Sequence, residues 1–322
     1  MKIRAIGLMS GGLDSCLAVK IIQEQNIEVL ALSFETPFFS AQKSIVMCGY
    51  LNVPIRVIDF TEEHLQMLKN PRYGYGKNMN PCIDCHGLMF KKAGELMHLE
   101  KFDFIFTGEV LNERPMSQNS RALRIVEKLS GLKGFILRPL SAKLLDETVP
   151  ELEGKVDRTR LLDICGKGRL RQMELAANYG LTDYPTPAGG CLLTDINFSK
   201  RLRDFLSICE NPSRNTLDIL KYGRILKLSE KARLIVGRNE NENNKITELA
   251  EYDDILIDAA DFPGPTGLLM FEKNDGLIKL SAEIIAAFSK TENNNQVSVT
   301  CGDKNILVDK KDKSLYAALY QA

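Results

Sequence analysis

Two adjacent glycines flanked by serines follow the first apolar segment of the chain, in a run that continues to Asp14 and Ser15. Such glycines let backbone N–H groups approach phosphate oxygens closely, and serine hydroxyls add hydrogen bonds. A carboxylate repels phosphate unless a cation lies between them, so we expect Asp14 to hold Mg²⁺. The run lacks the Gly-Lys-Ser/Thr of a Walker loop and the spacing of a dinucleotide fingerprint. It predicts a distinct phosphate-binding loop made of Ser10, Gly11, Gly12, Leu13, Asp14 and Ser15.

Three of the eight cysteines stand apart from the others in their surroundings. Cys82 and Cys85 have C-x-x-C spacing ahead of a predicted helix, and Cys191 follows two glycines. Thiolates in such patterns can work as a redox pair or bind metal. With His86 as a fourth ligand they would suit a structural zinc ion. Four further cysteines have apolar neighbours and are expected to be small core residues: Cys16, Cys48, Cys209 and Cys301.

The composition is that of a globular protein that does not enter a membrane. The chain has 322 residues, of which 44% are hydrophobic and 26% charged, and its formal net charge is zero. Nucleic acid would therefore have to be bound by a local basic patch. No apolar run approaches the roughly 20 residues of a membrane span. We expect a cytoplasmic protein without a disulfide framework. His64 and His98 are expected on helix surfaces.

Alternating strand and helix patterns position the phosphate loop and the first two cysteines. Strands are predicted at residues 2–9, 27–34, 54–60, 102–107 and 135–140, and helices at residues 15–25, 40–51, 83–98 and 119–129. This alternation predicts an α/β fold with a five-stranded parallel sheet and helices on both faces. The phosphate loop would then lie at the carboxyl edge of the sheet.

The pattern changes in the second half of the chain. Residues 146–180 are predicted to be helical and are rich in basic side chains, and a helix is predicted at residues 198–209. Short strands dominate after that, at residues 224–228, 233–236, 255–258, 268–271, 296–300 and 305–308. We therefore expect a catalytic domain at residues 1–210 and a smaller α+β domain at residues 211–322.

The loop resembles the PP-loop of the ATP pyrophosphatase superfamily, whose signature SGGxDS is complete here. The resemblance implies the adenine nucleotide alpha-hydrolase-like fold, and ATP that is cleaved to AMP and pyrophosphate when an oxygen is adenylated. It also implies that the base lies near Ser33 and Phe34, and that Thr107 and Gly108 complete the nucleotide site. The acceptor of the adenylate differs between branches of this superfamily.

The cysteine segments resemble those of the tRNA thiolation branch. Asn80-Pro81-Cys82 with Cys85, and the later Gly-Gly-Cys191, are similar to segments of 2-thiouridylases and 4-thiouridine synthases. The resemblance implies a tRNA sulfurtransferase, with sulfide or a persulfide as the sulfur donor. The thiols could carry a persulfide on Cys191 that Cys82 or Cys85 resolves, or they could hold a [4Fe-4S] cluster. A third cysteine favours the cluster, since a dithiol route does not need it. A small-molecule amide or amine ligase with structural zinc is the rival.

The C-terminal region resembles the NFACT-R domain, which binds RNA. The similar segment begins Val236-Gly237-Arg238-Asn239 and is followed by an Asp…Pro-Gly segment at residues 258–264. Ala259 and Ala260 stand where that family often has a histidine. The loop at residues 71–77 mixes cations with tyrosines beside the cysteines, so it is a second candidate for RNA contact. The sequence does not specify the oligomeric state or the modified uridine.

Overall fold

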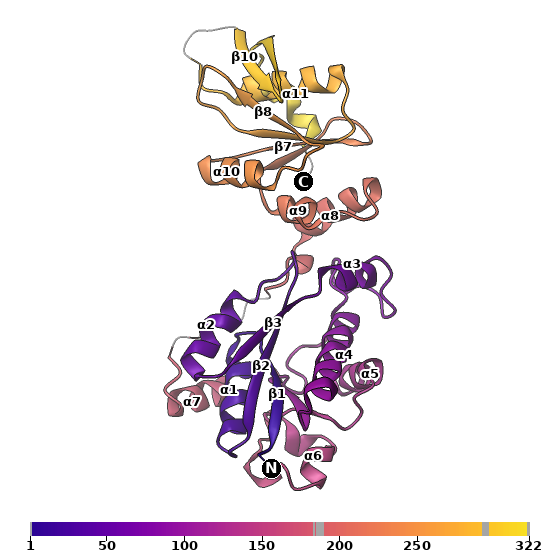
Figure 1. Cartoon of the computed structure of the whole chain (residues 1–322), viewed down its shortest axis with the longest axis vertical. Helices are drawn as coiled ribbons and strands as arrows, with labels where there is room; N and C mark the ends of the chain where they lie inside the picture. Colours follow the sequence, from indigo (N-terminus) through magenta and orange to yellow (C-terminus); the bar gives the residue numbers. More distant parts are fainter. Residues whose placement is uncertain (1, 183, 185–189, 292–295, 321–322) are drawn as a thin grey trace. The chain divides into compact units, whose positions relative to one another are not determined.

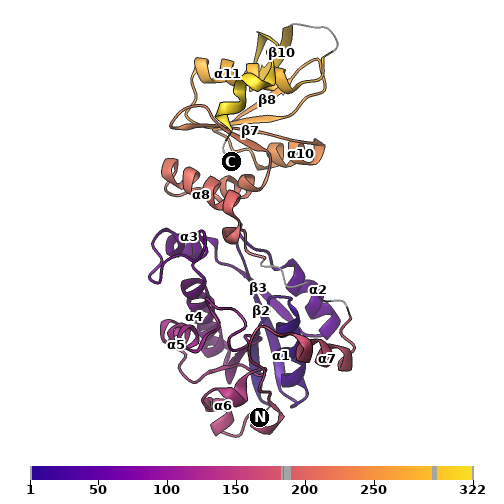
Figure 2. The same ribbon diagram turned by 180° about the vertical axis from the view of Figure 1, so that it is seen from behind.

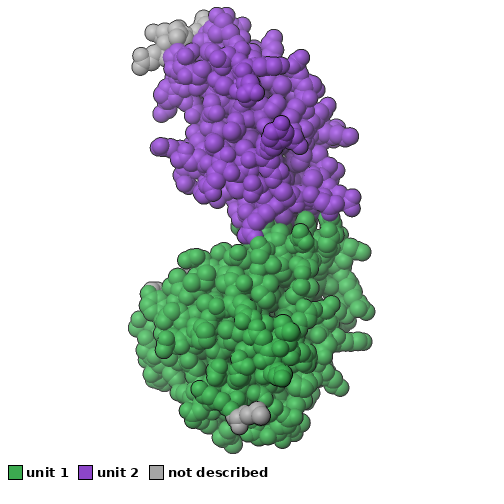
Figure 3. All heavy atoms as spheres, viewed as in Figure 1, with its two compact units in different colours: residues 1–194 green, residues 195–322 purple. Residues whose placement is uncertain are grey.

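The computed structural model describes residues 2–182, 184, 190–291 and 296–320, which fall into two compact units (Figure 3). Unit 1 is Met1–Thr194 and unit 2 is Asp195–Ala322. The division comes before the helix predicted at residues 198–209, and thus before the predicted boundary at residue 210. Helix α8 (Ile196–Ile208) belongs to unit 2 because Phe205 packs edge-on against Phe271 with ring centroids 5.2 Å apart and Asp204 pairs with Arg233. No helix in the described ranges is long and apolar enough to cross a membrane.

Unit 1 is built on a five-stranded sheet in the order β3-β2-β1-β4-β5. All neighbouring strands are parallel, as the alternating pattern predicted. Parallel neighbours require crossover connections, and helices supply most of them. The strands are β1 (Arg4–Leu8), β2 (Glu28–Glu35), β3 (Ile55–Asp59), β4 (Phe104–Thr107) and β5 (Ile136–Leu137).

Helices cover both faces of this sheet (Figures 1 and 2). On the strands, Ala5 and Phe106 join the core shared with one helical layer, whereas Ile6 and Ile105 join the core on the opposite face. Both faces are thus buried, which explains the nearly continuous apolar strands. The first layer is α1 (Leu13–Gln23), α2 (Gln42–Leu51) and α7 (Leu170–Asn178); the second includes α4 (Cys82–Glu100) and α5 (Ser120–Ser130).

Two parts of unit 1 differ from the prediction. The long helix predicted at residues 146–180 is instead the short α6 (Val149–Leu152), the 3-10 turn η2 (Arg158–Arg160) and α7. Gly154 and Gly166 have φ of 70° and 87° between these pieces, a conformation that interrupts a right-handed helix. The helix α3 (Thr61–Lys69) was not predicted at all.

The burial of His64 explains why the sequence did not predict α3. The prediction that His64 lies on a helix surface was wrong. The side chain is fully buried with Leu65 and Leu68, so α3 has a buried face that includes a residue normally counted as polar. The ring contacts Phe38, Phe39 and Phe60 at centroid distances between 5.4 and 5.7 Å. His98 is exposed, as predicted.

Unit 2 contains a six-stranded antiparallel sheet in the order β11-β10-β8-β9-β7-β6. Helix α11 (Asp275–Phe288) buries Ile284 and Ile285 in the core that this sheet shares. The strands are β6 (Arg224–Lys227), β7 (Ala232–Val236), β8 (Ile255–Ala259), β9 (Gly267–Phe271), β10 (Gln296–Cys301) and β11 (Lys304–Asp309). Two further helices are α9 (Arg214–Asp218) and α10 (Glu240–Leu249). The predicted smaller α+β domain is therefore present.

Candidate active site

The predicted phosphate loop connects β1 to α1. Gly11 has a φ of +72°, and a Cβ there would lie 2.5 Å from the carbonyl carbon of Lys43. The position therefore requires glycine for both conformation and space. The Ser15 hydroxyl donates to the Gly12 carbonyl at 2.7 Å, and the Gly12 N–H donates to Ser10 Oγ at 3.3 Å. No side chain caps α1, so the first N–H groups of the helix remain available to an anion.

The end of β4 presses against this loop. A Cβ on Gly108 would lie 2.4 Å from the backbone nitrogen of Ser15 and 2.5 Å from the carbonyl carbon of Asp14. Only glycine allows the two segments to approach this closely. The structure thus brings Thr107 and Gly108 together with the phosphate loop at the carboxyl edge of the sheet.

The two side chains expected near the base point into the interior. Ser33 is buried and its hydroxyl donates to Ser44 Oγ at 3.0 Å. Phe34 packs against Phe60 with ring centroids 5.1 Å apart and is 6% exposed. Both residues stand near the carboxyl end of β2, and their side chains are buried there.

The three predicted thiols form one group, which we call the thiol cluster. Cys82 and Cys85 stand in the first turn of α4, and Cys191 directly precedes the 3-10 turn η3 (Leu192–Thr194). Burial raises the pKa of Cys85 well above its usual value, and the charges of Cys191 and Cys82 raise it further. Burial raises the pKa of Cys191 to about 11, with a further contribution from Cys82. Such mutual effects require the thiols to be neighbours.

Backbone hydrogen bonds hold Cys191 in this group. The N–H of Leu192 donates to the Phe38 carbonyl at 2.9 Å, and the N–H of Met79 donates to the Leu193 carbonyl at 3.1 Å. These bonds fix the end of unit 1 to the loop that leads into the C-x-x-C turn. In the part of the chain that the structure describes, no three His, Cys, Asp or Glu side chains are grouped to hold a single metal ion.

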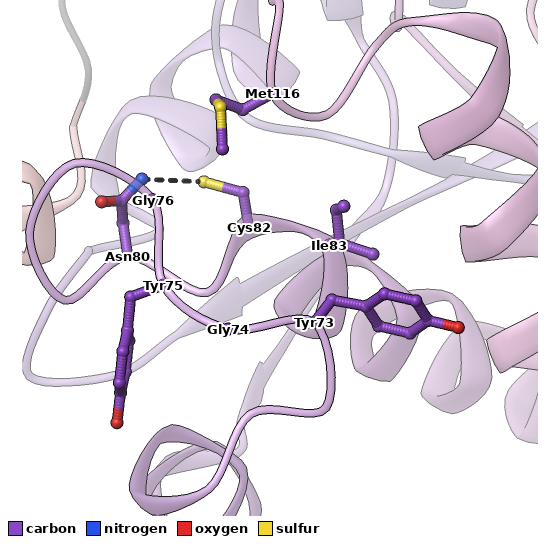
Figure 4. A pocket seen from close by; sticks show the side chains of 8 residues that line it. All are labelled: Tyr73, Gly74, Tyr75, Gly76, Asn80, Cys82, Ile83 and Met116. Atoms are coloured by element: carbon purple, nitrogen blue, oxygen red, sulfur yellow. Dashed lines mark hydrogen bonds between the residues drawn. The ribbon is translucent and has the colours of Figure 1, made fainter.

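A small hollow opens beside Cys82 (Figure 4). The sulfur of Cys82 accepts a hydrogen bond from Asn80 Nδ2 at 3.3 Å, and the side chain of Met116 faces this sulfur. The rings of Tyr73 and Tyr75 line the hollow but point away from the sulfur. The loop is tied to the cysteine turn because the carboxylate of Asp84 accepts the N–H groups of Arg72 at 3.1 Å and Tyr73 at 2.9 Å.

A buried ionic chain links the cysteine turn to the ends of β4 and β5. His86 Nδ1 lies 3.1 Å from Glu109 Oε1, and Arg138 Nε lies 3.1 Å from Glu109 Oε2. Arg138 also pairs with Glu127 at 2.7 Å. Burial alone would raise the pKa of Glu109, but Arg138 and then His86 hold it below its usual value. The carboxylate is therefore ionised and orients the His86 ring, so the Nδ1 side of His86 is held toward Glu109.

Several polar residues near Asp14 were not predicted as site residues. Burial raises the pKa of Asp14, and Arg169 and Arg114 partly offset this. Burial and then the charge of Asp14 raise the pKa of Glu113. Arg169 lies at the start of α7, inside the stretch that was predicted as one long basic helix. A correct boundary for α7 would have placed Arg169 near a helix end, but the sequence carries no signal that this end returns to the phosphate loop.

Residues 3–167 match the tRNA methyl transferase HUP domain family, which is just over half of the chain. The chain belongs to this family. Residues 223–314 match the NFACT protein RNA binding domain, as the Val236–Asn239 segment predicted. The predicted resemblance to PP-loop enzymes of tRNA thiolation is therefore confirmed.

Curated relatives of this HUP-domain chain are tRNA-specific 2-thiouridylases. MnmA of Pelobacter propionicus is 26% identical over 188 residues, covering 54% of this chain and 49% of that protein. MnmA of Karelsulcia muelleri is 27% identical over 253 residues, covering 74% of this chain and 58% of that protein. The chain thus spans about half the length of these relatives. A solved 4-thiouridine synthetase–RNA complex with bound ATP aligns with a TM-score of 0.36 and 18% identity, over 55% of this chain and 51% of that one.

In unit 2 the residues of the RNA-binding resemblance also maintain the local fold. Asn239 caps α10, accepting the N–H of Glu242 on Oδ1 at 3.0 Å. Glu242 pairs with Arg238 and accepts the Gly223 N–H at 3.3 Å. Asn243 Oδ1 accepts the N–H of Thr266 at 3.1 Å. Arg238 nevertheless remains about half exposed, with 48% of its side chain accessible.

Proposed function

We propose that this protein is an ATP-dependent tRNA sulfurtransferase that replaces a uridine oxygen with sulfur. One observation carries the proposal: the phosphate loop and the thiol cluster are joined through consecutive residues. Gly108 packs on the phosphate loop, and its neighbour Glu109 binds His86, which follows Cys85. Thiolation activates the carbonyl oxygen at an adenylation site and then adds sulfur to the carbon of the same carbonyl group, so the two sites must adjoin, and this continuity supports the proposal.

The reaction has two balanced steps. The uridine carbonyl oxygen attacks the α-phosphate of ATP, the bond to the β-phosphate breaks, and pyrophosphate leaves. A sulfide or persulfide sulfur then forms a bond to the same carbon, and the bond to oxygen breaks as AMP departs. The free N–H groups at the start of α1 would stabilise charge on the phosphates. The unpaired Oδ1 of Asp14 suits a Mg²⁺ ion bound to them.

We further propose that Cys82, Cys85 and Cys191 hold a [4Fe-4S] cluster. Thiolates are the usual cluster ligands, and the influence of Cys82 and Cys191 on the pKa of Cys85 supports the proposal. When bound, the cluster would supply an iron atom without a protein ligand, at which sulfide can bind. The other route uses the same thiols: Cys191 carries a persulfide, and Cys85 or Cys82 releases its terminal sulfur by forming a disulfide with Cys191. That route needs only two of the three residues.

Unit 2 is proposed to bind the tRNA. Its match to an RNA-binding domain supports this, and the formal net charge of zero means that local cations must make the contacts. Arg238 is a candidate because it is partly exposed in the matching segment.

Mass spectrometry of tRNA nucleosides tests the proposal. A deletion strain should lack one thionucleoside, and the wild-type gene should restore it. Cys191→Ala should not restore it, whereas Cys165→Ala should, because Cys165 is exposed and lies outside the thiol cluster. If the deletion strain loses no thionucleoside, the assignment is wrong. Anaerobic purification tests the cluster, which predicts a brown protein with about four irons per chain; a colourless zinc protein would favour a ligase.

A further inference from the structure

Unpaired polar atoms gather on the inner side of α7, beside the phosphate loop. Asp14 Oδ1, Arg169 Nε and both amide atoms of Gln172 are buried and have no hydrogen-bond partner within the described ranges. Gln172 is completely buried. Burial raises the pKa of Asp14, and the nearby Gln172 amide has the smallest of the lowering effects on it, without reaching hydrogen-bond geometry. Buried polar groups in folded proteins are normally paired, so several unpaired ones together indicate a missing polar partner.

The charged groups around these atoms are also incompletely paired. Arg169 Nη2 lies 3.8 Å from Asp14 Oδ2, and Arg169 Nε lies 3.9 Å from Glu113 Oε1. Both distances are too long for hydrogen bonds. The Arg169 guanidinium thus lies between the carboxylates of Asp14 and Glu113 without forming a hydrogen bond to either. The charge of Arg114 also acts on both carboxylates. Two carboxylates and two guanidinium groups suit a ligand that carries a divalent cation and an anion together.

Packing alone does not explain a glutamine at position 172. Helix α7 covers α1 through its inner face, where Ala176 is fully buried and joins the core of unit 1. A helix that only packed would place apolar side chains along this face. Gln172 lies one turn before Ala176, whereas its neighbours Arg171 and Met173 are 54% and 51% exposed.

We propose that α7 is part of the ATP site. Arg169, together with Arg114, binds the pyrophosphate portion of Mg-ATP, and Gln172 joins Asp14 and Glu113 as an oxygen ligand of its magnesium ion. The magnesium ion then neutralises the carboxylates of Asp14 and Glu113. Arg169 is therefore free to bind the oxygens of the departing pyrophosphate. This inference rests on the proposed function, because it assigns new residues to the same reaction.

Calorimetric titration of the full chain with Mg-ATP, Mg-pyrophosphate and AMP tests the role of Arg169. Arg169→Gln should weaken binding of Mg-ATP and Mg-pyrophosphate at least tenfold and leave AMP binding unchanged. The matched control is Arg171→Gln, because Arg171 lies on the same helix but faces outward and pairs with Asp163 at 2.8 Å. The control should bind all three ligands like the wild type. Affinities of Arg169→Gln within twofold of the wild type would overturn the inference.

Gln172→Met separates ligand binding from folding, since methionine keeps the volume and removes the unpaired amide. The melting temperature without ligand should rise, and the additional rise caused by Mg-pyrophosphate should be lost. A lower melting temperature with an unchanged response to Mg-pyrophosphate would show a purely structural role. A wild type that binds AMP but not Mg-pyrophosphate would refute this inference alone. A wild type that binds no nucleotide would refute the ATP step of the proposed function as well.

Discussion

Arg138 Nε lies 3.1 Å from Glu109 Oε2, and the two side chains are 3% and 6% exposed. The pair ties the residues after β4 to those after β5, at the edge where the phosphate loop lies. Because Glu109 also fixes His86, the pair supports both the sheet edge and the cysteine turn. Its contribution should therefore appear in stability and in activity.

Removing Arg138 should destabilise unit 1 strongly. Arg138→Met leaves a buried carboxylate without its main partner, which costs about 3–5 kcal/mol of unfolding free energy. Urea denaturation followed by circular dichroism measures this. The control is Arg56→Met, which breaks the exposed pair of Arg56 with Glu100 and should cost at most about 1 kcal/mol. Equal losses in the two variants would contradict a special role for the buried pair.

His64 predicts a loss of stability in mild acid. Burial lowers the pKa of this histidine from 6.5 to about 4, so the folded state favours the neutral ring. The stabilisation is complete above the unfolded pKa near 6.5 and is lost as pH falls from there toward 4, by about 3 kcal/mol in total. His64→Phe should flatten the dependence of unfolding free energy on pH in this range, whereas His98→Gln at an exposed site should leave it unchanged. A His64→Phe profile identical to the wild type would contradict this account.

Gly108→Ala should disturb the phosphate loop specifically. The added methyl group would overlap the backbone of Asp14 and Ser15, and such overpacking costs about 1–3 kcal/mol. ATP binding should fall more than tenfold in calorimetric titration. Gly49→Ala is the control because Gly49 lies within α2 with nothing near its missing Cβ, so it should keep ATP binding and gain up to about 1 kcal/mol. Unchanged ATP affinity in Gly108→Ala would separate β4 from the nucleotide site.

Cys82→Ala distinguishes the two sulfur routes. If the three thiols hold a cluster, the variant purified without oxygen should lose visible absorbance and iron, and thionucleoside formation should stop. If Cys191 and Cys85 carry out a persulfide–disulfide exchange, the thionucleoside should persist at a level close to that of Cys165→Ala. Persistence together with a colourless wild-type protein would exclude the cluster.

The sheet of unit 1 could be predicted because each strand is a short apolar run and each crossover helix has its own pattern. The phosphate loop and the first two cysteines were predictable for a related reason: their spacing is local. The position of Cys191 depends instead on backbone bonds from Leu192 to Phe38 and from Met79 to Leu193, which no sequence pattern records.

Other features depend on tertiary packing and could not be predicted from local patterns. A histidine such as His64 is buried only because three phenylalanine rings surround it. The end of α7 reaches the phosphate loop only after the stretch from 146 to 169 has broken into short turns. The side chain of Phe34 points into the core because β2 is a central strand with both faces covered.

The family match ends at residue 167, but Arg169, Gln172 and Cys191 lie beyond it. A truncated protein cut at the end of the match would keep all five strands and the C-x-x-C turn, yet it would lack one of the three thiols and the whole of α7. Fragments expressed for crystallography or activity assays should therefore extend at least through Thr194, where unit 1 ends. The proposed active site therefore includes residues beyond the segment that places the chain in its family.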